Sequence, residues 1–435
     1  MRHAVVIGCG VSGLFAARAL APHYDTVTIL EKDNVPESPT PRPGVPQGHH
    51  IHVMLAGGVR ALERLFPGAI DDLVAAGATL FDYGESRFHM LGDWMPRVHT
   101  GLPTLAVTRP FLEHHVRQWV GRIGNVCFRY GTAASPLTFD GTRVTGMEQS
   151  PADLVIDATG RHSRLPAWLA EHGFPRVPRT EVGFGLGYAT GRFRVPAAAL
   201  PDHPMLYVVG RPPRHTRVGV VLRMESGIVY GGMGGYQGDH PPGDPEGFLA
   251  FARSLVQPDV HRVLAQSELI GPIVRFRIPN SVRHHYARMR RFPAGILPIG
   301  DGICSYDPAF GHGMSVAALQ AEALSECLAA RSTDLAHDYF RRVEAIVDVP
   351  WNLCCGENLK YPGATGPRPL LFPVTRRLKD RLVTRRDPIS TVWSRLPRRR
   401  ERCCVLARYG RCFDNSVLGE RLGDEGIVLR CDLPM

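Results

Sequence analysis

The first 33 residues carry the pattern that most restricts the fold, because a strand, a glycine turn, a helix and a second strand follow one another directly. Residues 4–7 are an apolar run, residues 8–13 read Gly-Cys-Gly-Val-Ser-Gly, and residues 14–20 suit a helix. A second apolar run at 26–30 ends at Glu31. Short apolar runs around a crossover helix are typical of a parallel sheet that is buried on both faces.

The same turn predicts a ligand. In a G-x-G-x-x-G turn the first glycine allows the tight turn, the second lets a diphosphate approach the backbone, and the third lets the helix pack on the strand. The helix N-terminus offers free N–H groups to an anion, and an acid after the second strand suits a ribose diol. We therefore expect a dinucleotide to contact Gly8, Gly10, Gly13, Glu31 and the neighbouring Lys32. A purely structural glycine turn is the alternative.

Two later segments favour FAD over NAD. Residues 152–160 form another apolar strand that ends in Asp157 and Gly160, and residues 295–301 form a third that ends in Asp301. The sequence Pro-Ala-Phe-Gly-His-Gly-Met follows at 308–314, before a helix expected from about Ser315 to Arg331. Glycine turns at a helix start offer backbone N–H groups to an anionic group. The edge of a reduced flavin is such a group, because it carries negative charge. NAD needs no such distant second site, whereas an extended FAD does.

Together these motifs resemble those of the flavin-dependent monooxygenases of the para-hydroxybenzoate hydroxylase superfamily, over roughly residues 1–365. Residues 42–52, Arg-Pro-Gly-Val-Pro-Gln-Gly-His-His-Ile-His, and residues 348–351, Asp-Val-Pro-Trp, narrow the likeness. They resemble the flavin epoxidases of polyether ionophore biosynthesis.

The resemblance implies roles for individual residues. Gly8, Gly10, Gly13 and Glu31 would hold the ADP half of FAD, Arg42 would lie beside the cofactor, and Arg109 would contact its middle. Asp301 would bind the stretch from pyrophosphate to ribityl chain, and the isoalloxazine would lie along Pro308, Gly311, His312, Gly313 and Met314. A helix-start pairing with Glu113 is the alternative role for Arg109. His50 and His52 are candidates for approaching flavin or substrate, with a structural role as the alternative.

The expected fold class is α/β, with a Rossmann-like FAD-binding domain, an interleaved β-sheet substrate domain and a C-terminal helical segment. We assign residues 1–78, 107–170 and 291–345 to the first, 79–106 and 171–290 to the second, and 346–395 to the third. The glycine run at 231–235 does not open a helix and is expected to be a turn. Apolar candidates for lining the substrate cavity are Phe88, Met90, Trp94, Phe184, Tyr207 and Tyr230.

The resemblance implies that one oxygen atom from O2 is inserted into a lipophilic natural-product intermediate through a flavin C4a-hydroperoxide. Alkene epoxidation is the leading expectation, because it needs no protein base and the chain shows no evident catalytic dyad. Aromatic hydroxylation, with His89, His99 or Tyr230 as a candidate base, and a flavin dehydrogenase or reductase stay open. NADPH or NADH would donate electrons directly or through a separate flavin reductase. Halogenation is not expected, since the halogenase signature Trp-x-Trp-x-Ile-Pro is reduced to a single Trp94 before Met-Pro.

Composition excludes several other classes. The net charge is +10, but only three of the 51 basic residues are lysines, which suggests a composition bias rather than selection for nucleic-acid binding. No apolar run is long enough to span a membrane, so we expect a cytoplasmic protein without integral membrane association. The ten cysteines show no metal-binding spacing. Arginine and cysteine are concentrated in the tail at 396–435, to which we assign no function.

Overall fold

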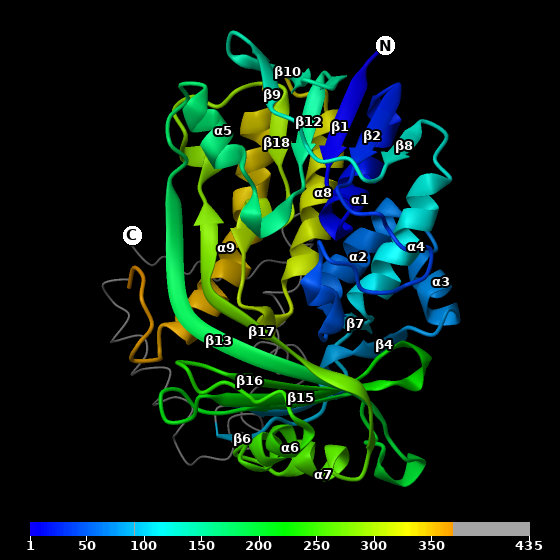
Figure 1. The fold of residues 1–435 in the computed structure, drawn as a ribbon, viewed down its shortest axis with the longest axis vertical. Coiled ribbons are helices and arrows are strands. Elements are labelled where there is room, and N and C mark those ends of the chain that lie inside the picture. Colours follow the sequence, from blue (N-terminus) through cyan, green and yellow to red (C-terminus); the bar gives the residue numbers. More distant parts are fainter. Residues whose placement is uncertain (91, 369–435) are drawn as a thin grey trace, which may run out of the picture.

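A five-stranded parallel sheet organises the upper part of the molecule in Figure 1. The computed structural model describes residues 1–90 and 92–368. The strand order is β18-β12-β1-β2-β8, with β1 and β2 joined by a helix as predicted. The bounds are β1 (His3–Ile7), β2 (Thr26–Leu30), β8 (Val126–Arg129), β12 (Leu154–Asp157) and β18 (Ile296–Pro298). Four of these strands are almost wholly buried, as expected for a parallel sheet covered on both faces, whereas the edge strand β8 exposes Cys127 and Arg129.

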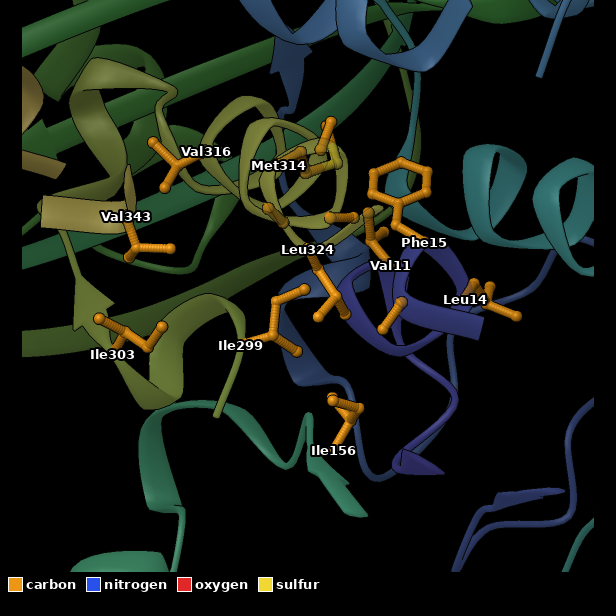
Figure 2. Close-up of a cluster of buried hydrophobic side chains, with 14 of the residues drawn as sticks. Val11, Leu14, Phe15, Ile156, Ile299, Ile303, Met314, Val316, Leu324 and Val343 are labelled. Carbon is orange, nitrogen blue, oxygen red and sulfur yellow. The ribbon is translucent and has the colours of Figure 1, made fainter. Parts of the chain in front are cut away.

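The main core lies where helices pack on this sheet and on one another. Helix α1 (Val11–Leu20) packs against α4 (Arg109–Gly121) and α8 (Gly313–Ala329), and α8 also contacts α2 (Ala56–Leu65) and α9 (Leu335–Asn358). Figure 2 shows part of this core, with Val11 and Phe15 of α1, Met314 and Leu324 of α8, and Ile156 of β12. Buried alanines on both α1 and α8 let the two helices approach closely.

An eight-stranded sheet forms the lower layer, with the order β19-β17-β13-β16-β15-β14-β5-β6. Its strands are antiparallel except for the pair β14 and β5. Helices α6 (Pro245–Arg253) and α7 (Asp259–Leu264) cover one face, below the sheet in Figure 1. The strand bounds are β5 (Arg87–Met90), β6 (Asp93–Trp94), β13 (Arg179–Arg194), β14 (Met205–Val209), β15 (Arg217–Arg223), β16 (Val229–Gly235), β17 (Glu268–His284) and β19 (Cys304–Ser305).

Two three-stranded sheets complete the structure. One consists of β9 (Leu137–Asp140), β10 (Arg143–Met147) and β11 (Ser150–Pro151), and the other of β3 (Val53–Met54), β4 (Thr79–Asp82) and β7 (Pro103–Ala106). Thus β5 and β6 of the segment 79–106 join the eight-stranded sheet, while β4 and β7 form the other sheet with β3, in which β7 is the central strand. The remaining α-helices of the described residues are α3 (Ala69–Ala75) and α5 (Leu165–Glu171).

The α/β class with an interleaved β-sheet layer and a C-terminal helix is confirmed. Helix α9 runs across the expected boundary at 345 and 346 as one continuous helix. The rest of the expected C-terminal segment, from residue 369, and the tail at 396–435 lie outside the described residues. In the described part of the chain, no helix combines the length and the apolar character that crossing a membrane requires.

The prediction of a turn at 231–235 is wrong, because these residues form most of the buried strand β16. β16 pairs with β13 on one side and β15 on the other. Its glycines leave room for side chains from elsewhere: a Cβ on Gly231 would lie 2.8 Å from Leu264 Cδ1, and a Cβ on Gly232 would lie 2.8 Å from Ile51 Cδ1. Long-range packing therefore overrides the local preference of glycine for turns.

The substitution Gly235→Ala tests this close packing. Its Cβ would lie 1.6 Å from the backbone oxygen of Asp239, so the backbone itself must shift. We expect the free energy of unfolding, measured by urea denaturation, to fall by about 2–3 kcal/mol. The control is Gly124→Ala, which meets nothing within 4 Å and should change stability by less than about 0.5 kcal/mol. Equal effects of the two substitutions would contradict the packing described for β16.

Candidate functional site

Three glycine-containing turns meet at one edge of the parallel sheet. They follow β1, β12 and β18, which are direct neighbours, so their carboxyl ends lie together. The turns are in contact: a Cβ on Gly8 would lie 2.8 Å from the carbonyl oxygen of Ala158, and a Cβ on Gly300 would lie 2.3 Å from Ser12 Oγ. The sequence motifs at 8–13, 157–160 and 300–301 thus form one continuous surface.

The first turn has the geometry of a cradle for a diphosphate. Gly8 has φ +102°, and a Cβ on Gly13 would lie 1.9 Å from the carbonyl oxygen of Gly8, so neither position accepts a side chain. Gly10 is the N-cap of α1, and no side chain caps this helix start. The first N–H groups of α1 are therefore available to an anion. A Cβ on Gly10 would point at Arg109, 3.1 Å from Nη2.

A cluster of buried charges surrounds this turn. Arg42 Nη1 lies 3.0 Å from Glu31 Oε2 and 2.8 Å from Asp33 Oδ2. Glu31 also accepts hydrogen bonds from the backbone N–H groups of Cys9 (2.8 Å) and Asp33 (3.0 Å), which ties the end of β2 to the glycine turn. Arg109 pairs with Glu113 across one turn of α4, at 2.7 Å. Lys32 is exposed and lies outside this cluster.

Asp157 organises the second turn. Its Oδ1 accepts hydrogen bonds from the backbone N–H (3.1 Å) and the hydroxyl (2.5 Å) of Thr159, and its Oδ2 accepts one from the Ser163 hydroxyl. The side chain is fully buried. Gly160 follows with φ +79°. In this structure the carboxylate of Asp157 is thus engaged within its own turn.

Asp301 lies in the third turn, where the charges of two arginines act on it. Burial raises the pKa of its carboxyl, and the positive charges of Arg109 and Arg161 lower it. Among the described residues, Asp301 makes no hydrogen bond through its side chain, so its oxygens can accept from a ligand. Its Oδ1 lies 3.9 Å from the position of a Cβ on Gly313, where α8 begins.

A side chain of the eight-stranded sheet holds the loop that precedes α8 in place. Pro308 begins a short 3-10 turn, Gly311 ends it with φ +68°, and His312, Gly313 and Met314 lead into α8. The Tyr207 hydroxyl of β14 donates to the carbonyl oxygen of Ala309 at 3.0 Å. Burial lowers the pKa of His312 to about 4, so this imidazole is neutral at pH 7.

A fully buried carboxyl, Asp307, anchors the same loop, and sequence reasoning missed it. Its Oδ1 accepts from the Ala309 backbone N–H at 2.9 Å, and its Oδ2 accepts from the Tyr236 hydroxyl at 2.9 Å. Burial raises the pKa of Asp307 to about 6. An Asp directly before Pro308 is a local signal for this cap, whereas no local signal links it to Tyr236.

The two candidate histidines have different surroundings. His50 is buried: its Nδ1 lies 2.9 Å from Thr190 Oγ1, and its ring meets Tyr188 edge-on with centroids 4.5 Å apart. Burial lowers the pKa of His50 to about 3. The Nδ1 of His52 lies 2.9 Å from the carbonyl oxygen of His50, and burial, together with the charge of Arg109, lowers the pKa of His52 to about 4. Both imidazoles are therefore neutral at pH 7.

The six apolar candidates for the cavity lining do not all lie together. Phe88, Met90, Tyr207 and Tyr230 belong to one cluster between the eight-stranded sheet and the sheet of β3, β4 and β7. Trp94 packs with the residues of α6 and α7 on the opposite face. Phe184 lies in the main core and contacts Tyr236 edge-on, with ring centroids 6.2 Å apart.

No family model matches the chain. Among curated proteins, it is 32% identical over 421 residues to Protein Rv3254 of Mycobacterium tuberculosis (strain ATCC 25618 / H37Rv), with 90% of this chain and 88% of that protein covered.

Solved structures with a similar fold include flavin-dependent enzymes. The flavin-dependent brominase Bmp2 has a TM-score of 0.65 at 15% identity, covering 95% of this chain and 94% of that one. The tetrameric 2-methyl-3-hydroxypyridine-5-carboxylic acid oxygenase has a TM-score of 0.59 at 18% identity, covering 87% and 93%. PqsL from Pseudomonas aeruginosa has a TM-score of 0.60 at 15% identity, covering 83% and 99%. At these identities the likeness establishes the fold, which is that of flavin-dependent monooxygenases.

The raised pKa of Asp307 gives a prediction about stability. Because the folded state favours the protonated carboxyl, stability is lost as the pH rises from the unfolded value near 3.8 to about 6, and then stays level. In Asp307→Asn this loss is absent. Relative to the parent chain, the variant should gain roughly 2–2.5 kcal/mol in free energy of unfolding between pH 4 and pH 7, measured by denaturant titration.

Asp82 is the matched control, because its pKa is shifted in the opposite direction to that of Asp307. Burial alone would raise its pKa, but hydrogen bonds from Thr100, Gly84 and Gly101 lower it. Asp82→Asn should therefore lose stability relative to the parent chain as the pH rises. The same pH trend in both variants would contradict the surroundings described for Asp307.

Proposed function

This chain belongs to the same protein family as Protein Rv3254 of Mycobacterium tuberculosis, and we propose that it is an FAD-dependent monooxygenase. The observation that carries the proposal is the meeting of three turns at one sheet edge, next to a loop that the second sheet holds in place. An extended dinucleotide is the ligand that needs a diphosphate cradle at one end and a second helix start at the other.

In this proposal each part of the edge contacts a different part of FAD. Gly8, Gly10 and Gly13 receive the ADP half, with Glu31 at the ribose and Arg42 beside it. Arg109 and Asp301 contact the middle of the cofactor, where the chain changes from diphosphate to ribityl. The loop from Pro308 to Met314 borders the isoalloxazine, and the uncapped start of α8 offers N–H groups to its N1 and C2 carbonyl edge.

Bound FAD would supply the redox chemistry, taking electrons from NADPH or NADH and activating O2 for transfer of one oxygen atom. The donor delivers its electrons directly or through a separate flavin reductase. The residues of the chain bind and orient the cofactor, exclude water and hold the substrate. Tyr207 connects the two layers of the structure, because its ring belongs to the apolar cluster and its hydroxyl bonds the loop at Ala309.

A lipophilic substrate would suit the apolar cluster that Tyr207 links to this loop. The cluster around Phe88, Met90 and Tyr230 consists of aromatic and aliphatic residues, among them Met205 and Met224. Methionine side chains adapt to irregular apolar ligands. We infer an electron-rich natural-product intermediate as the substrate class.

The surroundings of the candidate bases favour epoxidation over hydroxylation of a phenol. A base for phenol deprotonation works best with a pKa near the operating pH. Burial lowers the pKa of His50 to about 3 and raises that of Tyr230 to about 12, which makes the first a weak base and keeps the second protonated. His99 is exposed and bonds Glu85, and His89 packs edge-on against Trp94, with centroids 5.3 Å apart. Alkene epoxidation requires none of these groups as a base.

Oxygen-18 labelling separates the candidate reactions. The reduced holoenzyme, supplied with NADPH, labelled O2 and a panel of polyenes and phenols, should place one labelled atom in an epoxide. Label in a ring hydroxyl would identify an aromatic hydroxylase instead. Substrate oxidation without label in the product would identify a dehydrogenase and contradict oxygen insertion.

Gly10→Val is predicted to abolish FAD retention. The new side chain would project toward Arg109 Nη2, into the path by which a diphosphate approaches the backbone. The measurement is the ratio of flavin to protein absorbance after purification, with unfolding temperature as a check on folding. Gly356→Ala on α9, which meets nothing within 4 Å, is the control and should retain FAD. Unchanged flavin content in a folded Gly10→Val variant would contradict the cradle.

A further inference from the structure

Glu113 lies between the two arginines that the proposed function assigns to FAD. Its Oε1 is 2.7 Å from Arg109 Nε, and its Oε2 is 3.7 Å from Arg42 Nε. The side chain of Glu113 is only 5% exposed, so this carboxylate lies inside the protein and not on its surface. Arg42 and Arg109 are far apart in the sequence, and both lie beside the carboxylate of Glu113.

The pairing fixes which end of Arg109 remains free. Within the described residues, the hydrogen bonding of Arg109 goes through Nε to Glu113, and its Nη1 and Nη2 atoms have no side-chain or backbone acceptor. Nη2 lies 3.1 Å from the position of a Cβ on Gly10. The two-pronged end of the guanidinium therefore faces the point where the glycine turn admits a diphosphate, and this end can bind phosphate oxygens in bidentate fashion.

The backbone around Glu113 is itself held in place. Arg109 is the first residue of α4, and Thr108 caps the helix by accepting from the Phe111 backbone N–H at 3.3 Å. Glu225, from the connection between β15 and β16, accepts from the Thr108 backbone N–H at 2.8 Å and from its hydroxyl. Glu113 then lies one helical turn beyond Arg109, on the same face of α4.

We propose that Glu113 is a positioning residue that holds Arg109 over Gly10 for the diphosphate of FAD. The inference rests on the proposed FAD binding. An arginine side chain has several freely rotating bonds, and holding it in one orientation before the ligand arrives removes that entropic cost from binding. Arg42 is oriented separately, because its Nη1 already bonds Glu31 and Asp33.

The test is FAD affinity of the flavin-free full-length chain, measured by quenching of flavin fluorescence. Glu113→Leu removes every acceptor, and we expect the Kd for FAD to rise about 10-fold, as for loss of an oriented charge-assisted hydrogen bond. Glu113→Gln keeps an amide oxygen that can accept from Arg109 Nε, so its Kd should rise only about 3-fold. The graded order separates positioning from a mere loss of charge, which both variants share.

A double-mutant cycle with Arg109→Leu shows whether Glu113 acts through that arginine. Once Arg109 is absent, adding Glu113→Leu, or Glu113→Gln if the leucine variant does not fold, should change the Kd by less than about 2-fold. Additive effects would overturn the proposal. So would equal affinities of the parent chain and both single variants.

Asp239→Asn is the control for losing a carboxylate that pairs with an arginine. Asp239 bonds Arg217 at 2.7 Å and 2.8 Å, away from the glycine turns, and its loss should leave the Kd for FAD unchanged. A parent chain that binds no FAD at all would refute the proposed function. FAD binding by the parent chain without coupling between Glu113 and Arg109 would refute only the positioning role.

Discussion

The parallel pairing of β18, β12 and β1 is the constraint on which the site depends. In-register pairing of these neighbours brings three turns, separated by long stretches of chain, to one edge of the sheet. The absence of side chains then lets the turns touch, since a Cβ on Gly8 would lie 2.8 Å from the carbonyl oxygen of Ala158 and one on Gly300 would lie 2.3 Å from Ser12 Oγ. A side chain at either glycine would separate the turns and break the continuous surface that an extended cofactor requires.

The second layer is tied to this edge by a few specific contacts. Ile51 packs against Gly232 of β16, and His50 bonds Thr190 of the adjacent strand β13. Thr190 and Gly232 are paired in register, so these two contacts lie side by side on the sheet. On the other side of the site, Tyr207 and Tyr236 hold the loop before α8 through their hydroxyl groups. The glycine-rich strand, the histidine motif and the tyrosines thus determine how far the apolar cluster lies from the proposed flavin position.

Local chemistry made much of this predictable from sequence. The βαβ unit at the N-terminus follows from apolar periodicity and glycine spacing, which act over a few residues. The same signals predicted a helix from about Ser315 to Arg331, and the structure has it at Gly313–Ala329. The strand nature of 231–235, the link from Asp307 to Tyr236 and the contact of Glu113 with Arg42 could not be predicted in this way. Each depends on residues that are distant in the chain, such as Ile51 and Leu264 filling the space that the glycines leave. For Arg109, the structure contains the pairing with Glu113 that was the alternative to a cofactor role. This pairing uses Nε and leaves both Nη atoms without an acceptor among the described residues.

A crystal structure of the chain with FAD tests the central claim most directly. The account predicts one extended FAD, with its diphosphate at Gly10 and bonded by the Nη atoms of Arg109, its ribityl chain at Asp301, and its isoalloxazine along residues 308–314 facing Tyr207. An FAD that binds elsewhere, or density for the ADP half alone with the flavin away from the loop before α8, would contradict it.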